Sequence, residues 1–259
     1  MTPTLPALFI GHGNPMHALQ DNAITQAWHG AVAGLPRPRA ILVISAHWLT
    51  RGTAVTAMAH PETLHDFEGF PRQLAEFDYP APGDPALAQE IADLLGASSV
   101  ALDLDWGLDH GAWSVLAHLY PRADIPVVQL SLDVTRRAAE HYALGRTLRP
   151  LRAAGVLVVG SGNVIHNLGL MDWRHPDSAT DWARRFNDRL RDQLELADHN
   201  GLLELDSADA HLAVPTPEHY WPLLYIAALA DAGETPAFFN DRIEYGSIGM
   251  LSFRIGAQP

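Results

Sequence analysis

The chain has 259 residues, of which 47% are hydrophobic and 18% charged, so it can build a sizeable core and is not a disordered protein. Acidic residues outnumber basic ones by 30 to 17, and the net charge of −13 disfavours nucleic acid and anionic membranes as partners. All basic residues are arginine and cysteine is absent, which excludes lysine Schiff bases, P-loop lysines, disulfides, thiolate nucleophiles and cysteine-ligated metals.

Short apolar runs bounded by turn residues recur along the chain and predict buried strands over residues 7–10, 40–44, 53–58, 127–130, 155–159 and 248–255. Capping residues and helical spacing predict helices over residues 84–95, 133–148, 178–196 and 217–232. The alternation of strands and helices indicates a layered α/β fold with a largely buried sheet. A proline-rich stretch over residues 70–85 is expected to be an irregular surface loop, so we expect one domain spanning residues 1–259.

No run of about 18 apolar residues occurs, and no basic segment precedes the first apolar stretch. We therefore expect a cytoplasmic protein that does not enter the membrane.

Histidine is abundant, with 14 residues, and four of these lie where chemistry is common in α/β folds. His12, His47 and His166 each follow a predicted strand, and His219 lies in the first turn of the last predicted helix. Ligands bind beyond the carboxyl ends of strands in open α/β sheets, and neutral imidazole binds zinc, iron, copper and nickel. A metal site built from histidine is one interpretation. Hydrogen-bonded structural histidines are the other, because a single histidine at a strand end is more often structural than a ligand.

The other histidines carry weaker signals. His110 precedes a helical run and is either a pocket residue or a simple helix-terminal residue, and His65 either helps to line a pocket or is exposed. The rest are expected to be surface or helix-face residues without a role: His17, His29, His60, His118, His141, His175, His199 and His211.

Two other kinds of site are poorly supported. Gly160-Ser161-Gly162 lacks the spacing of a nucleophile elbow, and Gly11-His12-Gly13 does not continue as a dinucleotide fingerprint.

A series of short motifs runs through almost the whole chain in a characteristic order. They are GHGNPM at 11–16, SAHW at 45–48, HDFEGFP at 65–71, YPAPG at 79–83, LDHGAW at 108–113, GSGNVIHNL at 160–168 and PEHY at 217–220. With these motifs the sequence resembles the class III extradiol ring-cleaving dioxygenases, in the branch of the 4,5-DOPA extradiol dioxygenases.

The resemblance implies an α/β fold with a mixed central sheet flanked by helices, and one mononuclear divalent metal bound by His12, His47 and His219. His166 would lie beside the metal as an acid/base residue or, with zinc bound, as a further ligand, and His110 would be a pocket residue next to the metal. Fe(II) is expected for turnover and Zn(II) as purified. The wider class uses two histidines and a glutamate, so Glu218 is the carboxylate alternative to His219.

The implied reaction is cleavage of a DOPA-like catechol ring by O₂ to a muconic semialdehyde, in a monomer or small homo-oligomer. His166 would take a proton from the catechol, and His110 would donate a hydrogen bond to reduced oxygen. The aromatic candidates for stacking on the substrate, which are equally well interpreted as core residues, are Trp48, Phe67, Trp113 and Tyr220. The alternatives are a zinc hydrolase and a non-catalytic binding protein on the same scaffold. None of the 17 arginines can be assigned to the pocket from sequence.

Overall fold

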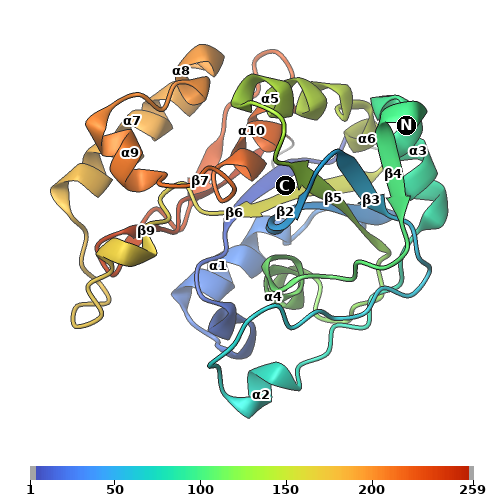
Figure 1. The fold of residues 1–259 in the computed structure, drawn as a ribbon, viewed down its shortest axis with the longest axis horizontal. Helices are drawn as coiled ribbons and strands as arrows, with labels where there is room; N and C mark the ends of the chain where they lie inside the picture. Colours follow the sequence, from blue (N-terminus) through green and yellow to red (C-terminus); the bar gives the residue numbers. More distant parts are fainter. Residues whose placement is uncertain (1–3, 257–259) are drawn as a thin grey trace.

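The computed structural model describes residues 4–256 and is built around a sheet of eight strands in the order β4-β3-β5-β2-β6-β1-β10-β7 (Figure 1). These strands are β1 Ala7–Gly11, β2 Ala40–Thr50, β3 Thr53–Thr56, β4 Val100–Asp103, β5 Val127–Asp133, β6 Val156–Gly162, β7 Ala237–Phe239 and β10 Ser252–Ile255. The strands β8 Ile243–Glu244 and β9 Ile248–Gly249 form a separate antiparallel pair.

The sheet is mixed, as expected. Strands β5, β2, β6 and β1 are parallel neighbours, whereas β10 runs antiparallel to β1, and β3 pairs with β5 in the antiparallel sense. The register pairs Gly11 of β1 with Gly162 of β6, and Ser45 of β2 with Ser161 of β6. The carboxyl ends of β1, β2 and β6 therefore meet at one edge of the sheet, which is where a site is expected in such folds.

Helices cover both faces of the sheet (Figure 1). One face packs against α1 Ala23–Val32, α4 His110–Leu119 and the 3-10 turn η1 Pro15–Leu19. The other packs against α3 Pro85–Leu95, α5 Ala138–Thr147, α6 Pro150–Ala153 and α10 Trp221–Ala228. Successive side chains of a strand point to opposite faces, so Ile41 and Val43 of β2 join the first core and Leu42 and Ile44 join the second. This arrangement confirms the predicted α/β layered fold.

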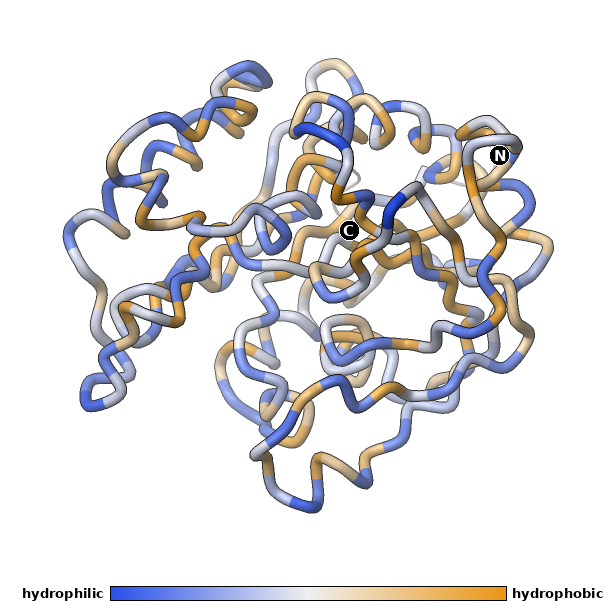
Figure 2. The backbone as a smooth tube through the Cα atoms, viewed as in Figure 1, coloured by the Kyte–Doolittle hydropathy of each residue, from blue (hydrophilic) through white to orange (hydrophobic). Residues whose placement is uncertain are grey.

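Figure 2 shows the consequence, with apolar residues concentrated in the strands and polar residues along the outer loops. A further group of helices extends beyond the sheet at the left of Figure 1: α7 Asp181–Glu195, α8 His199–Leu203 and α9 Ala208–Ala213. The remaining short elements are α2 Arg72–Ala75, η2 Ala97–Ser99 and η3 Leu168–Leu170. Within residues 4–256, no helix combines the length and the apolar character that crossing a bilayer requires.

Two predicted strands are longer than the elements observed, whereas β2, β5 and β6 run past their predicted ends at residues 44, 130 and 159. The strand expected over residues 248–255 is wrong as a single element, because the chain bends between β9 and β10. At this bend the Ser252 hydroxyl donates to the Met250 carbonyl and accepts from the Gly11 backbone N–H. The strand expected over residues 53–58 ends at Thr56. The loop expected over residues 70–85 is irregular apart from α2 and the start of α3.

Three predicted helices are shorter than expected. The one predicted to start at residue 133 begins at Ala138, because Asp133 is still part of β5 and accepts hydrogen bonds from Thr135. The one predicted over residues 178–196 spans Asp181–Glu195. The last helix spans Trp221–Ala228 instead of residues 217–232, because the four residues before it form a turn.

Candidate metal centre

The structure brings the histidines that the sequence singled out to one edge of the sheet. His12 follows β1, as predicted, and is 2% exposed. His47 was expected past its strand but lies inside it, because β2 continues to Thr50 beyond an irregularity in its pairing with β5. His219 lies in the turn before α10 and not in its first turn, and His110 is the first residue of α4.

The rings of His12, His47 and His219 are nearly equidistant. Their centroids are 5.1 Å apart for His12 and His47, 5.4 Å for His12 and His219, and 5.0 Å for His47 and His219. Three imidazoles that bind one ion at about 2.1 Å in tetrahedral directions would have centroids roughly 5.2 Å apart. The spacing of these three rings therefore fits one shared cation.

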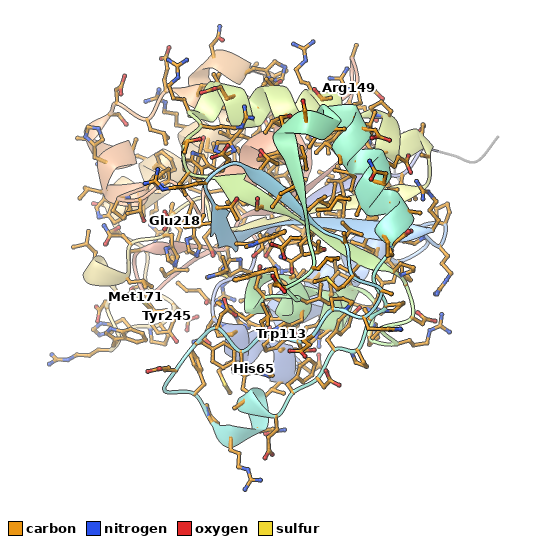
Figure 3. The ribbon with its side chains drawn as sticks, turned by 45° about the vertical axis from the view of Figure 1, so that its right-hand side comes forward. His65, Trp113, Arg149, Met171, Glu218 and Tyr245 are labelled. Carbon is orange, nitrogen blue, oxygen red and sulfur yellow. The ribbon has the colours of Figure 1, made fainter. Side chains whose placement is uncertain are left out.

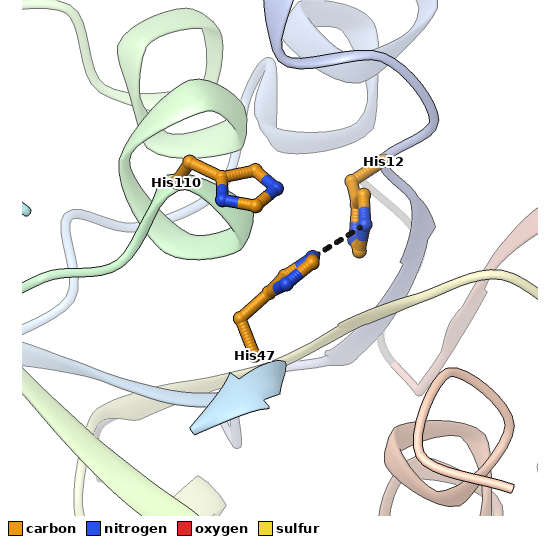
Figure 4. Close-up of side chains that lie close together, drawn as sticks. All are labelled: His12, His47 and His110. Carbon is orange, nitrogen blue, oxygen red and sulfur yellow. Dashed lines mark hydrogen bonds between the residues drawn. The ribbon is translucent and has the colours of Figure 1, made fainter. Parts of the chain in front are cut away.

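Hydrogen bonds fix which ring nitrogen is free in His12 and in His219. The Ser161 hydroxyl donates to the Gly111 carbonyl at 2.6 Å, so it accepts from Nδ1–H of His12 at 3.0 Å and leaves the Nε2 lone pair of His12 free. That Nε2 lies 3.2 Å from Nε2 of His47 (Figure 4). In His219, Nδ1 donates to Glu218 at 3.4 Å, while Nε2 is buried without a partner among residues 4–256. These nitrogens form a set of inward-facing donors for a metal.

Burial also favours the form of the rings that binds metal. It lowers the pKa of His12 and His219 well below the usual histidine value, and the neighbouring histidines lower it further. Burial and the proximity of His110 lower the pKa of His47 to about 3, although Asp66 acts in the opposite direction. Because metals bind neutral imidazole, the rings are in their ligating form at pH 7.

Two groups of side chains could each hold a metal ion, because the ligand atoms within each group lie within 4.8 Å of one another. The first is the buried group of His12, His47 and His110, which can hold a metal ion, and Figure 4 shows the three side chains converging. The second is His166 with Glu218 and His219. The ring of His110 lies 3.8 Å from that of His47 and 6.1 Å from that of His12, which departs from the even spacing of three shared ligands.

His110 is held by a residue that the sequence analysis did not single out. Oδ1 of Asp66 accepts from Nδ1 of His110 at 2.9 Å and from its backbone N–H at 3.0 Å. The other carboxylate oxygen of Asp66 lies 4.0 Å from Nδ1 of His47. Asp66 is the second residue of the motif HDFEGFP, which the sequence analysis quoted only for the family resemblance. Membership of that motif was the signal that could have identified it.

His166 lies beside the group rather than among the evenly spaced rings. Its ring stacks on that of His219, with centroids 3.5 Å apart and 8° between the planes. Its backbone forms an antiparallel bridge with Ile248 of β9. Burial lowers the pKa of His166, against a smaller opposing effect of Glu218, so this ring is also neutral at pH 7.

These histidines open onto a cavity of about 450 Å³ with mostly apolar walls. Its residues come from the loops after β1, β3, β6 and β8, from the turn before α10, and from β2, β8, β9 and the start of α4. They are His12, Gly13, Asn14, Pro15, His47, Phe67, Phe70, His110, His166, Leu168, Met171, Trp173, His219, Glu244, Tyr245 and Ile248. In the view of Figure 3, Met171, Tyr245 and Glu218 are labelled on the same side of the molecule. The volume is suited to one small aromatic molecule.

Of the four aromatic candidates, Phe67 alone lines this cavity. Trp48 stacks on Trp106, and Trp113 and Tyr220 are buried in the two cores. His65 is exposed and lies outside the cavity wall, although its ring is 5.8 Å from that of Trp113 (Figure 3).

Two histidines expected at the surface are buried. His17 is 5% exposed, and its ring packs edge-on against Trp28. His141 is fully buried, and its Nδ1 lies 3.0 Å from the hydroxyl oxygen of Tyr225. Their positions follow from packing between elements that are distant in sequence, which a local pattern does not reveal.

Glycines bring the backbone segments of the site together. A Cβ atom on Gly162 would collide with the carbonyl oxygen of His219, and one on Gly111 would lie 2.6 Å from the Ser45 hydroxyl. The Ser45 hydroxyl in turn donates to buried Asp109, which caps α4. Glycine is therefore required where α4 and the turn before α10 approach the strand ends.

The chain has relatives across nearly its whole length. The family described as the catalytic LigB subunit of aromatic ring-opening dioxygenase matches residues 6–253. A 4,5-DOPA dioxygenase extradiol from Escherichia coli (strain K12) is 49% identical over 97% of this chain and 95% of its own, and one from Beta vulgaris is 40% identical over 87% and 86%. An uncharacterized protein from Escherichia coli K12 has a crystal structure with a TM-score of 0.86 at 46% identity, covering 97% of this chain and all of its own.

Proposed function

The chain belongs to the LigB family of aromatic ring-opening dioxygenases and is an extradiol ring-cleaving dioxygenase, and we propose that it opens the ring of a DOPA-like catechol to a muconic semialdehyde. Its co-substrates are an aromatic compound and O₂. The bond broken lies beside one hydroxyl of the catechol, and both oxygen atoms of O₂ enter the product. We propose that residues 1–259 act as one catalytic domain.

The observation that carries this proposal is the convergence of free imidazole nitrogens in an apolar cavity. We propose that His12, His47 and His219 hold one divalent metal, supported by their even ring spacing and by the unpartnered Nε2 of His219. When bound, Fe(II) supplies the one-electron chemistry that O₂ requires with an aromatic ring, which redox-inert Zn(II) does not. Zinc is expected in the purified protein because such sites bind it more tightly than Fe(II).

The cavity would bind and orient the catechol ring. Phe67 and Phe70 have centroids 5.1 Å apart in an edge-to-face pair, and Phe67 also packs edge-on against His110. With Leu168 and Met171 they provide apolar walls that exclude water from the ring. The hydroxyl groups of the substrate would then point to the histidine end of the cavity.

We propose that His166 accepts the catechol proton at a ring nitrogen. Its neutral state at pH 7 and its position against His219 support this role. His110 would donate a hydrogen bond from Nε2 to the reacting oxygen in its doubly protonated form, in which Nδ1–H donates to Asp66 and holds the orientation of the ring. His166 as a further metal ligand is the alternative, supported by its proximity to Glu218 and His219.

The function is tested by anaerobic loading of the protein with Fe(II), followed by aerobic assay against a panel of catechols. We expect a coloured ring-opened product that absorbs in the visible range and consumption of one O₂ per catechol. The His47→Ala variant serves as the negative control. Absence of O₂ uptake with every catechol, in protein whose iron content is confirmed, would contradict the proposed function.

A further inference from the structure

A second cavity adjoins the catalytic one. It has a volume of about 330 Å³ and shares three wall residues with the catalytic cavity: Asn14, Glu244 and Tyr245. Arg242 and His17 line the second cavity only. A ligand whose ring fills the catalytic cavity can therefore place a substituent against this shared wall. We call the second cavity the side cavity.

The strand register fixes how far Glu244 lies from the catalytic histidines. Glu244 of β8 pairs with Ile248 of β9, and Ile248 forms a bridge with His166 on its other side. Two strand spacings separate the backbones of His166 and Glu244, or roughly 10 Å. Residues directly opposite one another point to the same face of a sheet, and all three residues line the catalytic cavity. A catechol next to His166 would direct a short substituent toward Glu244.

Glu244 is an unusual wall residue because it lacks adequate partners. Among the described residues that line the catalytic cavity, it is the one carboxylate, and none is an arginine. Its side chain is 15% exposed, and no hydrogen bond within residues 4–256 reaches its carboxylate. The nearest cation is Nε of Arg242 at 3.7 Å. Burial raises the pKa of Glu244 because its negative charge loses hydration. A cationic ligand group would compensate for this loss.

Arg242 provides the opposite charge in the side cavity. Its Nη2 donates to Asp177 at 2.7 Å, while Nε has no closer partner than Glu244. The Arg242 side chain is 39% exposed, so it can still bind an anion. His17 adds a buried Nε2 without a partner among the described residues. The side cavity thus combines one cation, one anion and an unused polar nitrogen.

We propose that the side cavity is the subsite for the ring substituent of the substrate, and that Glu244 and Arg242 select a zwitterionic α-amino-acid substituent by binding its ammonium and its carboxylate. The inference rests on the proposed function, because that function places the catechol ring in the catalytic cavity. Glu244 and Arg242 are specificity-determining residues in this account. They take no part in ring opening.

The proposal is tested by binding, independently of turnover. Zinc-loaded protein is titrated calorimetrically without oxygen with four catechols that differ only in their substituent: L-DOPA, dopamine, 3-(3,4-dihydroxyphenyl)propionate and 4-methylcatechol. We expect L-DOPA to bind about tenfold or more tightly than 4-methylcatechol, as one charge-assisted hydrogen bond allows. Dopamine should also bind more tightly than the propionate, because Glu244 lies in the shared wall.

Two variants separate the two charges. Glu244→Gln should weaken the binding of L-DOPA and of dopamine about tenfold. The propionate should bind equally or more tightly, because Arg242 loses the carboxylate that competes for it. Arg242→Gln should weaken L-DOPA and the propionate by a similar factor, and dopamine should bind equally or more tightly. The matched controls are Arg39→Gln and Glu90→Gln, from an exposed ion pair of 2.6 Å that lines neither cavity. These controls should leave all four affinities at the wild-type values.

The result that would overturn the inference is a uniform effect. The inference is wrong if Glu244→Gln lowers the affinity for all four catechols by the same factor, or if the wild type binds dopamine and 4-methylcatechol equally. In either case the side cavity does not select the substituent. Failure of the proposed function has a different signature, because iron-loaded protein would then open no ring even though the binding series keeps its charge selectivity.

Discussion

The imidazole of His166 lies flat against that of His219, with ring centroids 3.5 Å apart and planes 8° from parallel. Two rings that bind the same ion point toward it from different directions. Parallel stacked rings are therefore not the arrangement expected when both bind the same metal. Within the proposed function, this relationship favours His166 as the proton acceptor and His219 as the ligand.

The variant His166→Gln should therefore retain metal but lose activity. We expect kcat to fall by about 10²- to 10⁴-fold, the usual contribution of a general base. Metal content by elemental analysis and the rate of ring opening are measured on the same preparation. Loss of metal in parallel with loss of activity would instead assign His166 to the ligand set.

Replacing a ligand should remove metal and activity together. His12→Ala and His47→Ala each remove an inward-facing nitrogen, so we expect metal affinity to fall at least about 100-fold. His65→Ala is the matched control, because His65 is exposed outside the cavity wall and should keep full metal content. Retention of stoichiometric metal in both ligand variants would be inconsistent with the proposed centre.

A single methyl group should disrupt the approach of α10 to the sheet. In Gly162→Ala the new Cβ would collide with the His219 carbonyl oxygen, so we expect a loss of about 1–3 kcal/mol in the free energy of unfolding. Gly30→Ala, in the last turn of α1 with nothing within 4 Å of its Cβ, should gain about 0.5–1 kcal/mol in the free energy of unfolding. Urea unfolding measures both. Equal stability of the two variants would contradict the requirement for glycine at position 162.

Stability should fall with acid partly through His141. Burial lowers the pKa of His141 to about 4, and Asp133 and Glu140 oppose this effect while Arg136 adds to it. The unfolded chain therefore binds this proton first as the pH falls, and His141 contributes stability at pH 7 that is lost between about pH 6.5 and pH 4. The total is roughly 3 kcal/mol for this one residue.

The variant His141→Gln should reduce the slope of unfolding free energy against pH by up to about 1.4 kcal/mol per pH unit in that range. Urea titrations at several pH values between 7 and 5 give the slope for both proteins. An unchanged slope would show that His141 is not the proton-linked group, even if the variant is less stable throughout because the Tyr225 hydroxyl has lost its partner.

Much of the site was predictable because its main residues lie at strand ends. His12 follows a short apolar run and is flanked by glycine, so local pattern and the topology of α/β sheets placed it correctly. His47 was placed at the correct edge of the sheet, although it lies within β2. Local pattern also singled out His219, and the family resemblance added its role as a metal ligand and the mixed character of the sheet.

The residues that sequence reasoning missed owe their positions to contacts between distant segments. Glu244 belongs to a strand of two residues, too short to give a periodic signal, and its role depends on register with β9. Asp66 meets His110 across 44 residues of chain. The burial of His17 depends on packing against Trp28 of α1. Such long-range contacts are set by the assembled core, not by the composition of either segment.

The central claim is that His12, His47 and His219 share one metal ion, and a crystal structure of the zinc-loaded protein with anomalous diffraction at the zinc edge tests it most directly. We predict one strong anomalous peak about 2.0–2.1 Å from Nε2 of all three residues. A peak bound by His12, His47 and His110, or by His166 with Glu218 and His219, would contradict the claim.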